Sequence, residues 1–179
     1  MKEFWDFDEN KNYTSVNIRG INFKVINKYH DYKTAGIILY NIHIIINNIC
    51  QYLQVNFYKY SKSDQKYIIC FLDIHPNKYL LSEMQLGTMF NGINKPRNLY
   101  HSKDNISIGK DGTLRAGYRH IFLTLRKSNG TFKDFNKIME LVIHEFAHTM
   151  CNHVTWRDDD HGSDFKNAEK ILWESYKKL

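Results

Sequence analysis

Two histidines and one glutamate lie within the stretch LVIHEFAHTM, residues 141–150. His144 and His148 are four residues apart, so on a helix their imidazoles project from one face about one turn apart. Imidazoles placed in this way can bind one zinc ion without bending the backbone. Glu145 is turned roughly 100° round the helix from His144, which puts its carboxylate beside the metal, where a general base would act on water. The alternative interpretation is a partly buried helix face that carries two histidines and binds no metal.

A catalytic zinc site needs a third protein ligand and one open coordination position. We expect His161 to be this ligand, because it follows three aspartates and precedes a glycine that lets the chain turn sharply into the next helix. Glu169 and His153 are the two alternatives. The longer pattern HExxHxxGxxH is absent, because Cys151 and Val154 occupy the positions of its glycine and its last histidine.

The hydrophobic pattern indicates the two helices that must position these side chains. One helix is predicted to begin near Asp134, a favourable N-cap residue after an Asn-Gly turn. Its apolar stripe comprises Ile138, Met139, Val142, Ile143, Phe146 and Met150. The segment 152–160 is polar, and a last helix is predicted over residues 163–176, with Phe165 among its packed apolar residues.

The rest of the chain supplies strands and one long helix. Residues 16–26 alternate enough to suggest a first strand, and apolar spacing of three and four predicts a helix over 32–54. The apolar run 67–74 is typical of a buried central strand. A hairpin followed by a further strand is predicted within 106–126. The order strand, helix, strands, helix, helix predicts an α+β fold with a small mixed sheet.

Composition sets the class of protein. The 179 residues suit one domain, 1–179, and 15% aromatic residues with only 2 prolines argue against disorder. The net charge of +6 favours anionic partners, but the basic residues are scattered, which is also typical of a solvated surface. We expect one zinc ion per chain and make no prediction of oligomeric state.

Cysteine usage and hydropathy suggest where the protein resides. The 3 cysteines show no CxxC spacing, which favours a reducing compartment over a disulfide framework. The acidic, aromatic N-terminus is unlike a signal peptide. The most apolar segment, 35–49, is too short and too polar to cross a bilayer. We therefore expect an intracellular protein, cytoplasmic or nuclear or nucleoid-associated, with no membrane partner.

The motif H-E-F-A-H, twelve residues and then H-G-S-D-F resembles the SprT-like metalloproteases. The preceding stretch, 121–148, resembles the related WLM metalloproteases, which have a strand, an NG-type turn and a helix leading to HELxH. The resemblance covers about residues 119–172. It implies a minimal zincin-like fold with a catalytic core at about 106–176. It also implies a single-zinc metalloendopeptidase with His144, His148 and His161 as ligands and Glu145 as the base. Phe165 resembles the aromatic residue that packs under the site in these families.

The resemblance further implies how a substrate would bind. The strand 119–126 would be an antiparallel edge strand, to which an extended protein or peptide substrate adds as a further strand. The substrate-binding residues would be Ile121, Phe122, Leu123, Thr124 and Leu125.

These families are associated with cutting proteins crosslinked to DNA, and the basic charge balance agrees with a DNA-bound substrate. The chain carries no CxxC zinc ribbon and no basic-aromatic cluster typical of single-strand binding. The alternative hypothesis is a non-catalytic zinc-containing module that binds an extended peptide or nucleic acid. The intact Glu145 argues against it, because a structural zinc site has no need of a base.

Overall fold

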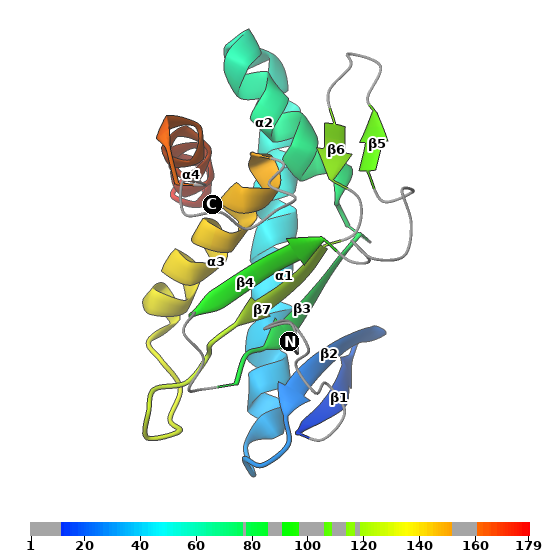
Figure 1. The fold of residues 1–179 in the computed structure, drawn as a ribbon, viewed down its shortest axis with the longest axis vertical. Helices are drawn as coiled ribbons and strands as arrows, with labels where there is room; N and C mark the ends of the chain where they lie inside the picture. Colours follow the sequence, from blue (N-terminus) through cyan, green and yellow to red (C-terminus); the bar gives the residue numbers. More distant parts are fainter. Residues whose placement is uncertain are drawn as a thin grey trace, which may run out of the picture.

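The computed structural model describes residues 12–76, 78–85, 91–96, 106–108, 114–116, 119–151 and 161–179. Strands and helices are combined in the predicted α+β manner (Figure 1). The strands are β1 (Tyr13–Ile18), β2 (Ile21–Ile26), β3 (Tyr79–Glu83), β4 (Gly92–Pro96), β5 (Ile106–Ile108), β6 (Leu114–Ala116) and β7 (Arg119–Leu123). The helices are α1 (Tyr32–Asn56), α2 (Lys62–Asp73), α3 (Phe135–Met150) and α4 (Ser163–Tyr176), with the short 3₁₀ helix η1 (Phe57–Lys59).

Five strands form a mixed sheet in the order β1-β2-β3-β7-β4. The pairs β1–β2 and β4–β7 are antiparallel, whereas β2–β3 and β3–β7 are parallel. The predicted hairpin within 106–126 is confirmed as β5 and β6, which pair antiparallel in a separate two-stranded sheet. The predicted small mixed sheet is therefore confirmed for the described residues, and its antiparallel edge strands are β1 and β4.

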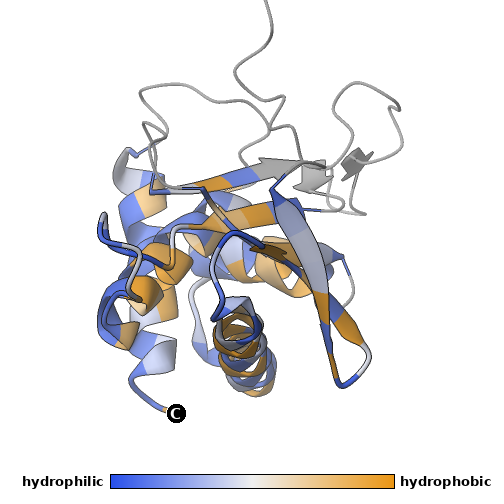
Figure 2. Ribbon diagram, turned by 90° about the horizontal axis from the view of Figure 1, so that it is seen from below, coloured by the Kyte–Doolittle hydropathy of each residue, from blue (hydrophilic) through white to orange (hydrophobic). Residues whose placement is uncertain are grey.

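Helices cover one face of the large sheet. α1 contacts β1, β2 and β3, while α3 contacts β7 and β4 and also packs on α2 and α4. Figure 2 shows apolar residues gathered where the helices meet the sheet. The long helix predicted over 32–54 is confirmed, and most of its apolar stripe is fully buried: Ala35, Leu39, Ile42, Ile46, Ile49 and Leu53. Within the described residues, no helix has both the length and the apolarity that crossing a bilayer requires.

The first predicted strand, 16–26, is two strands. β1 and β2 are joined by a two-residue turn, in which Arg19 has φ 49° and Gly20 has φ 85°. Both residues of this turn type need positive φ, and glycine supplies it at the second position without strain. The Asn17 side chain accepts a hydrogen bond from the Gly20 N–H at 3.2 Å. The prediction was wrong because both arms of a hairpin alternate in the same way as one strand.

The run 67–74, predicted as a central strand, lies almost entirely within α2. Ser61 caps this helix, because its hydroxyl accepts a hydrogen bond from the Asp64 N–H at 3.1 Å. Ile68 and Phe71 are three residues apart and are fully buried together. A short apolar run carries no decisive period, so the polar N-cap signal before it should have decided for helix.

The strand predicted at 119–126 is confirmed as β7 over Arg119–Leu123, but its predicted place at the sheet edge is wrong. β3 pairs with one side of β7 and β4 with the other. Ile121, Phe122, Leu123, Thr124 and Leu125 are all buried inside the sheet. Among the described strands, the edge beside α3 is β4, which the hydrophobic pattern had not indicated.

A buried arginine ties together four segments next to this sheet. Arg126 is 1% exposed, and its guanidinium contacts Glu83 at 2.7 Å and Asp31 at 2.8 Å. It also donates a hydrogen bond to the Gly130 carbonyl at 2.9 Å. The rings of Tyr29 and Phe132 lie 3.9 Å and 4.2 Å from its Cζ, which allows cation–π contacts on the guanidinium.

Candidate metal centre

The helix α3 presents both motif histidines on one face. It begins after Asp134, the predicted N-cap residue, although the Asp134 side chain accepts no cap hydrogen bond. All six residues of the predicted apolar stripe are buried, and this side of the helix packs into the core. His144 and His148 are consequently directed away from the core centre and are half-buried.

His161 joins them from the segment before α4, as predicted. The Nε2 atoms of His144 and His161 are 3.2 Å apart, and one ligand atom from each of the three histidines lies within 4.8 Å of the others. Two nitrogens bound to one tetrahedral metal ion at about 2.0–2.1 Å would be roughly 3.3 Å apart. The three imidazoles are therefore close enough to hold a metal ion, and the fourth position would stay open.

The ring of Phe165 packs against all three histidines. Its ring centroid lies 4.9 Å from that of His144, 4.7 Å from that of His148 and 4.7 Å from that of His161. The side chain is 3% exposed and comes from the first turn of α4. The predicted packing of Phe165 under the site is confirmed, and the contact joins α4 to the histidines of α3.

Glu169 orients the first histidine and is not one of the clustered ligands. Its Oε1 lies 3.5 Å from His144 Nδ1, the ring nitrogen opposite to the one that faces His161. A carboxylate behind a metal-binding histidine fixes the tautomer and orientation of its ring. Burial, together with the nearby His161, lowers the pKa of His144 and favours the neutral form that binds metal. The other alternative ligand, His153, lies outside the described residues.

Glu145 is buried beside the three histidines, between α3 and the start of β4. Its side chain is 4% exposed, and a Cβ atom added to Gly92 would lie 2.6 Å from its Oε1. A side chain at position 92 would therefore require the carboxylate and the nearby Leu141 side chain to move. Burial raises the pKa of Glu145 to about 8, because the charged form loses its water.

This pKa predicts how the stability of the metal-free protein depends on pH. The folded state holds the Glu145 proton up to about pH 8, whereas the unfolded chain releases it near the ordinary value of 4.5. Between these values the unfolded state binds fewer protons, so the free energy of unfolding falls as pH rises, by up to roughly 1.4 kcal/mol per unit. Urea denaturation with a chelator, from pH 5 to 8.5, should show this slope in the wild type and a flatter one in Glu145→Gln. Equal slopes in the two proteins would contradict the raised pKa of Glu145.

A side chain on β4 fastens the edge strand to the metal-site helix. The Asn94 amide nitrogen donates to the Glu145 carbonyl and to Thr149 Oγ1, the latter at 2.7 Å. The Asn94 Oδ1 accepts a hydrogen bond from Arg119 at 3.4 Å. These hydrogen bonds fix the position of the Glu145 backbone relative to β4.

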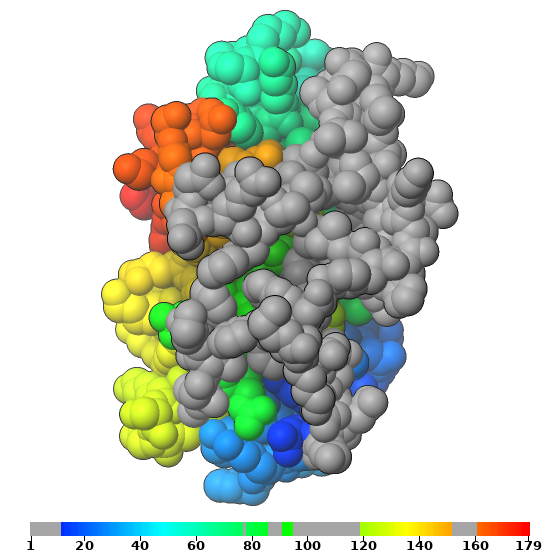
Figure 3. Space-filling view, viewed as in Figure 1, coloured from blue at the N-terminus to red at the C-terminus, as the bar shows by residue number. Residues whose placement is uncertain are grey.

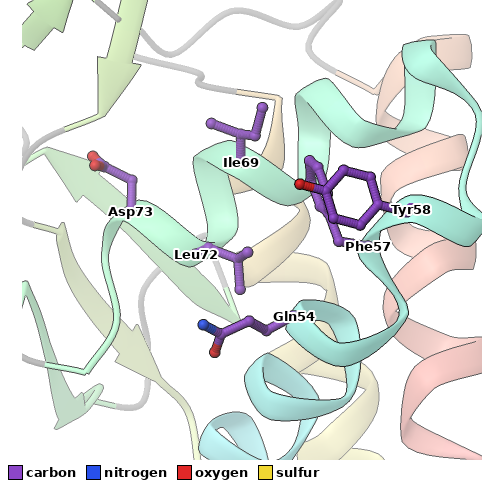
Figure 4. Close-up of a pocket in the computed structure, with 6 residues that line it drawn as sticks. All are labelled: Gln54, Phe57, Tyr58, Ile69, Leu72 and Asp73. Atoms are coloured by element: carbon purple, nitrogen blue, oxygen red, sulfur yellow. The ribbon is translucent and has the colours of Figure 1, made fainter.

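A cleft of about 1010 Å³ opens in front of α3 and reaches the site at His144. It is lined by residues from β4, from the loop before α3, from α3 itself and from α4, including His144, Glu145 and Glu169. In Figure 3 the yellow N-terminal half of α3 lies below the orange α4 on the left of this face. A second hollow of about 500 Å³ lies between the end of α1 and α2, and contains none of the predicted site residues (Figure 4).

A comparison of the chain with protein-family models, curated proteins and solved structures finds no match.

The three histidines and Glu145 could be found from the sequence alone. Gly92 and Asn94 were missed, because they lie some fifty residues upstream and only β4 pairing brings them to the site. Glu169 was noticed as an acid at a suitable distance, but its role behind His144 required the structure.

Proposed function

We propose that the protein is a zinc-dependent metallopeptidase that hydrolyses peptide bonds. The observation that carries this proposal is the convergence of three imidazoles on one point, with one of them, His144, lining the same cleft as the buried Glu145. Neutral imidazoles at tetrahedral spacing favour zinc among the common divalent ions. Glu145 gives the site a base that a structural zinc site would not need, and the SprT-like spacing of the motifs supports the same function.

In this proposal His144, His148 and His161 hold the ion, and Glu169 fixes the His144 ring. Bound zinc supplies a Lewis acid that polarises a peptide carbonyl and lowers the pKa of water. The positive charge of bound zinc would lower the pKa of Glu145 below its value in the metal-free protein, so that the carboxylate is ionised. It would then accept a proton from the attacking water as the water oxygen bonds to the carbonyl carbon. Glu145 then gives this proton to the amide nitrogen as the C–N bond breaks. The products are a carboxylic acid and an amine, so one water is consumed for each bond.

The substrate is proposed to be an extended segment of protein that pairs with β4. Proteins bound or crosslinked to DNA are the substrate class that the family resemblance implies. The Asn91 carbonyl accepts a hydrogen bond from the Thr124 N–H at 2.9 Å, so residue 91 directs its main-chain groups towards β7. By alternation Gly92 and Asn94 direct theirs outward, on the side available to a further strand. This orientation also suits Pro96, which has no N–H to donate.

Zinc content tests the proposal first. Elemental analysis should find about one zinc per chain in the wild type and a clear loss in His161→Ala, because two imidazoles alone bind zinc weakly. His30→Ala changes an exposed histidine outside the site and should keep its zinc. The same preparations should be assayed for cleavage of an unfolded protein, with and without DNA.

Three outcomes of this experiment are informative. Zinc and cleavage that are lost together in His161→Ala would support the metallopeptidase. Zinc without cleavage of any substrate would favour the binding module for an extended peptide or nucleic acid. Full zinc occupancy in His161→Ala would show that the third ligand is another residue.

A further inference from the structure

The cleft in front of α3 extends well beyond the metal centre and ends among lysines. Lys127, Lys133 and Lys137 line this end, together with Asp134 and Glu140. Lys137 and His144 lie seven residues apart on one helix, which corresponds to about 10 Å along its axis. A substrate bound at the metal centre would therefore reach the lysines through about three extended residues.

The lysines differ in whether an acidic residue already neutralises them. Lys137 makes an ion pair with Glu140 at 3.0 Å. Lys127 and Lys133 make no ion pair with any residue that the structure describes. Burial lowers the pKa of Lys133, since its ammonium loses water without gaining a carboxylate. A negatively charged group from outside the chain would compensate the desolvation of the Lys133 ammonium.

The direction of β4 determines which part of a substrate reaches these lysines. An extended segment that pairs antiparallel to β4 runs from the Pro96 end towards the Asn91 end. Glu145 lies next to Gly92, so the bond to be cut is close to the start of β4. Beyond it, hydrogen bonds from Thr124 to Asn91 and from Lys133 to Leu125 place the lysine-bearing loop beside the start of β4. The residues after the scissile bond therefore extend towards Lys133 and Lys127.

We propose that this end of the cleft is a subsite for an acidic side chain, so that the enzyme prefers Asp or Glu about three residues after the scissile bond. The inference rests on the proposed peptidase function and names the substrate class of that same site. Lys127 and Lys133 determine this specificity, since a carboxylate at that place would form charge-assisted contacts that the described part of the chain does not provide for them. The same position filled by lysine would add repulsion.

Matched peptides test the subsite. Three fluorogenic peptides would differ only at the third residue after the scissile bond, which is Glu, Gln or Lys. We expect kcat/KM to be at least tenfold higher for Glu than for Lys in the wild type. The double variant Lys127→Glu/Lys133→Glu should reverse this order, whereas Lys66→Glu, on the exposed side of α2, should preserve it. The preference should also weaken at high salt, because the lysines are only partly buried.

A binding measurement separates this inference from the proposed function. Zinc-loaded Glu145→Gln should bind the Glu peptide more tightly than the Lys peptide by fluorescence anisotropy, even if no cleavage occurs with any variant. The same preference in the double variant, or a preference that follows an acid placed before the scissile bond, would overturn the subsite. Tight binding of a DNA oligonucleotide that depends on Lys127 and Lys133, with equal affinity for all peptides, would also overturn it and assign this end to phosphate.

Discussion

Replacement of Glu145 by glutamine is expected to lower kcat for peptide cleavage by about 10²–10⁴-fold, the usual contribution of a general base. Glutamine has the same shape and fits the space opposite Gly92, but its amide cannot accept the proton of the attacking water. Zinc should remain at about one ion per chain, because the carboxylate is not among the clustered ligands. KM should change much less than kcat, since the cleft keeps its lining.

Glu174→Gln is the control for the same chemical change, because Glu174 is exposed on α4 and is not among the residues that line the cleft. It should retain activity close to that of the wild type. Undiminished cleavage by Glu145→Gln, with the zinc content confirmed, would refute the assigned base. Loss of both zinc and folded structure in this variant would instead show that Glu145 has a structural role.

Arg126→Ala is expected to lower the free energy of unfolding by about 3–5 kcal/mol, which is the usual cost of leaving a buried charge without its partner. The Glu83 carboxylate is 0% exposed and would lose its contact with Arg126, keeping only the hydrogen bond from the Ile26 N–H at 2.9 Å. Asp31 would lose its partner as well. Urea denaturation of the metal-free variant would measure the loss.

Lys137→Ala is the control for this change, because the Lys137–Glu140 pair has the same chemistry on the surface. Its side chains are 67% and 52% exposed, so its removal should cost no more than about 1 kcal/mol. If both variants lose the same stability, the buried arginine contributes no more than an ordinary surface charge. Its contacts with β3, with the start of α1 and with the loop at Gly130 would then contribute little to the free energy of unfolding.

The parts of the site predicted correctly from sequence are those where metal-binding residue types and a helical hydrophobic period occur in the same stretch. His144 and His148 lie four apart on a helix whose apolar stripe is complete, so one local stretch contains the full signal. His161 required the motif after the polar loop as well as its composition. Phe165 was expected from the same motif, and its contact with all three imidazoles confirms it.

The errors arose where a structure depends on partners distant in the chain. The alternation of 16–26 is the same for one strand and for a hairpin, and only Gly20 marks the turn. The run 67–74 is apolar on most sides because α2 lies between α1, α3 and α4. β4 carries Gly92, Asn94 and Pro96, which disfavour a strand locally, and it exists because β7 pairs with it. Tertiary pairing overrides local preference at this edge.

The missing side chain at Gly92 has a consequence for recognising distant relatives. A Cβ atom there would lie 2.6 Å from Glu145 Oε1 and 2.8 Å from Leu141 Cδ1, so a larger residue at position 92 requires both side chains to move, although 53 positions separate it from Glu145 in the sequence numbering. A diverged homologue that keeps the glutamate should keep glycine at the first residue of its edge strand. In a homologue that has lost the glutamate, the constraint on the glycine would be weaker, and the contact with the side chain at position 141 would remain. This pairing therefore provides a covariation signature by which catalytic members of a lineage could be separated from inactive ones without a substrate assay.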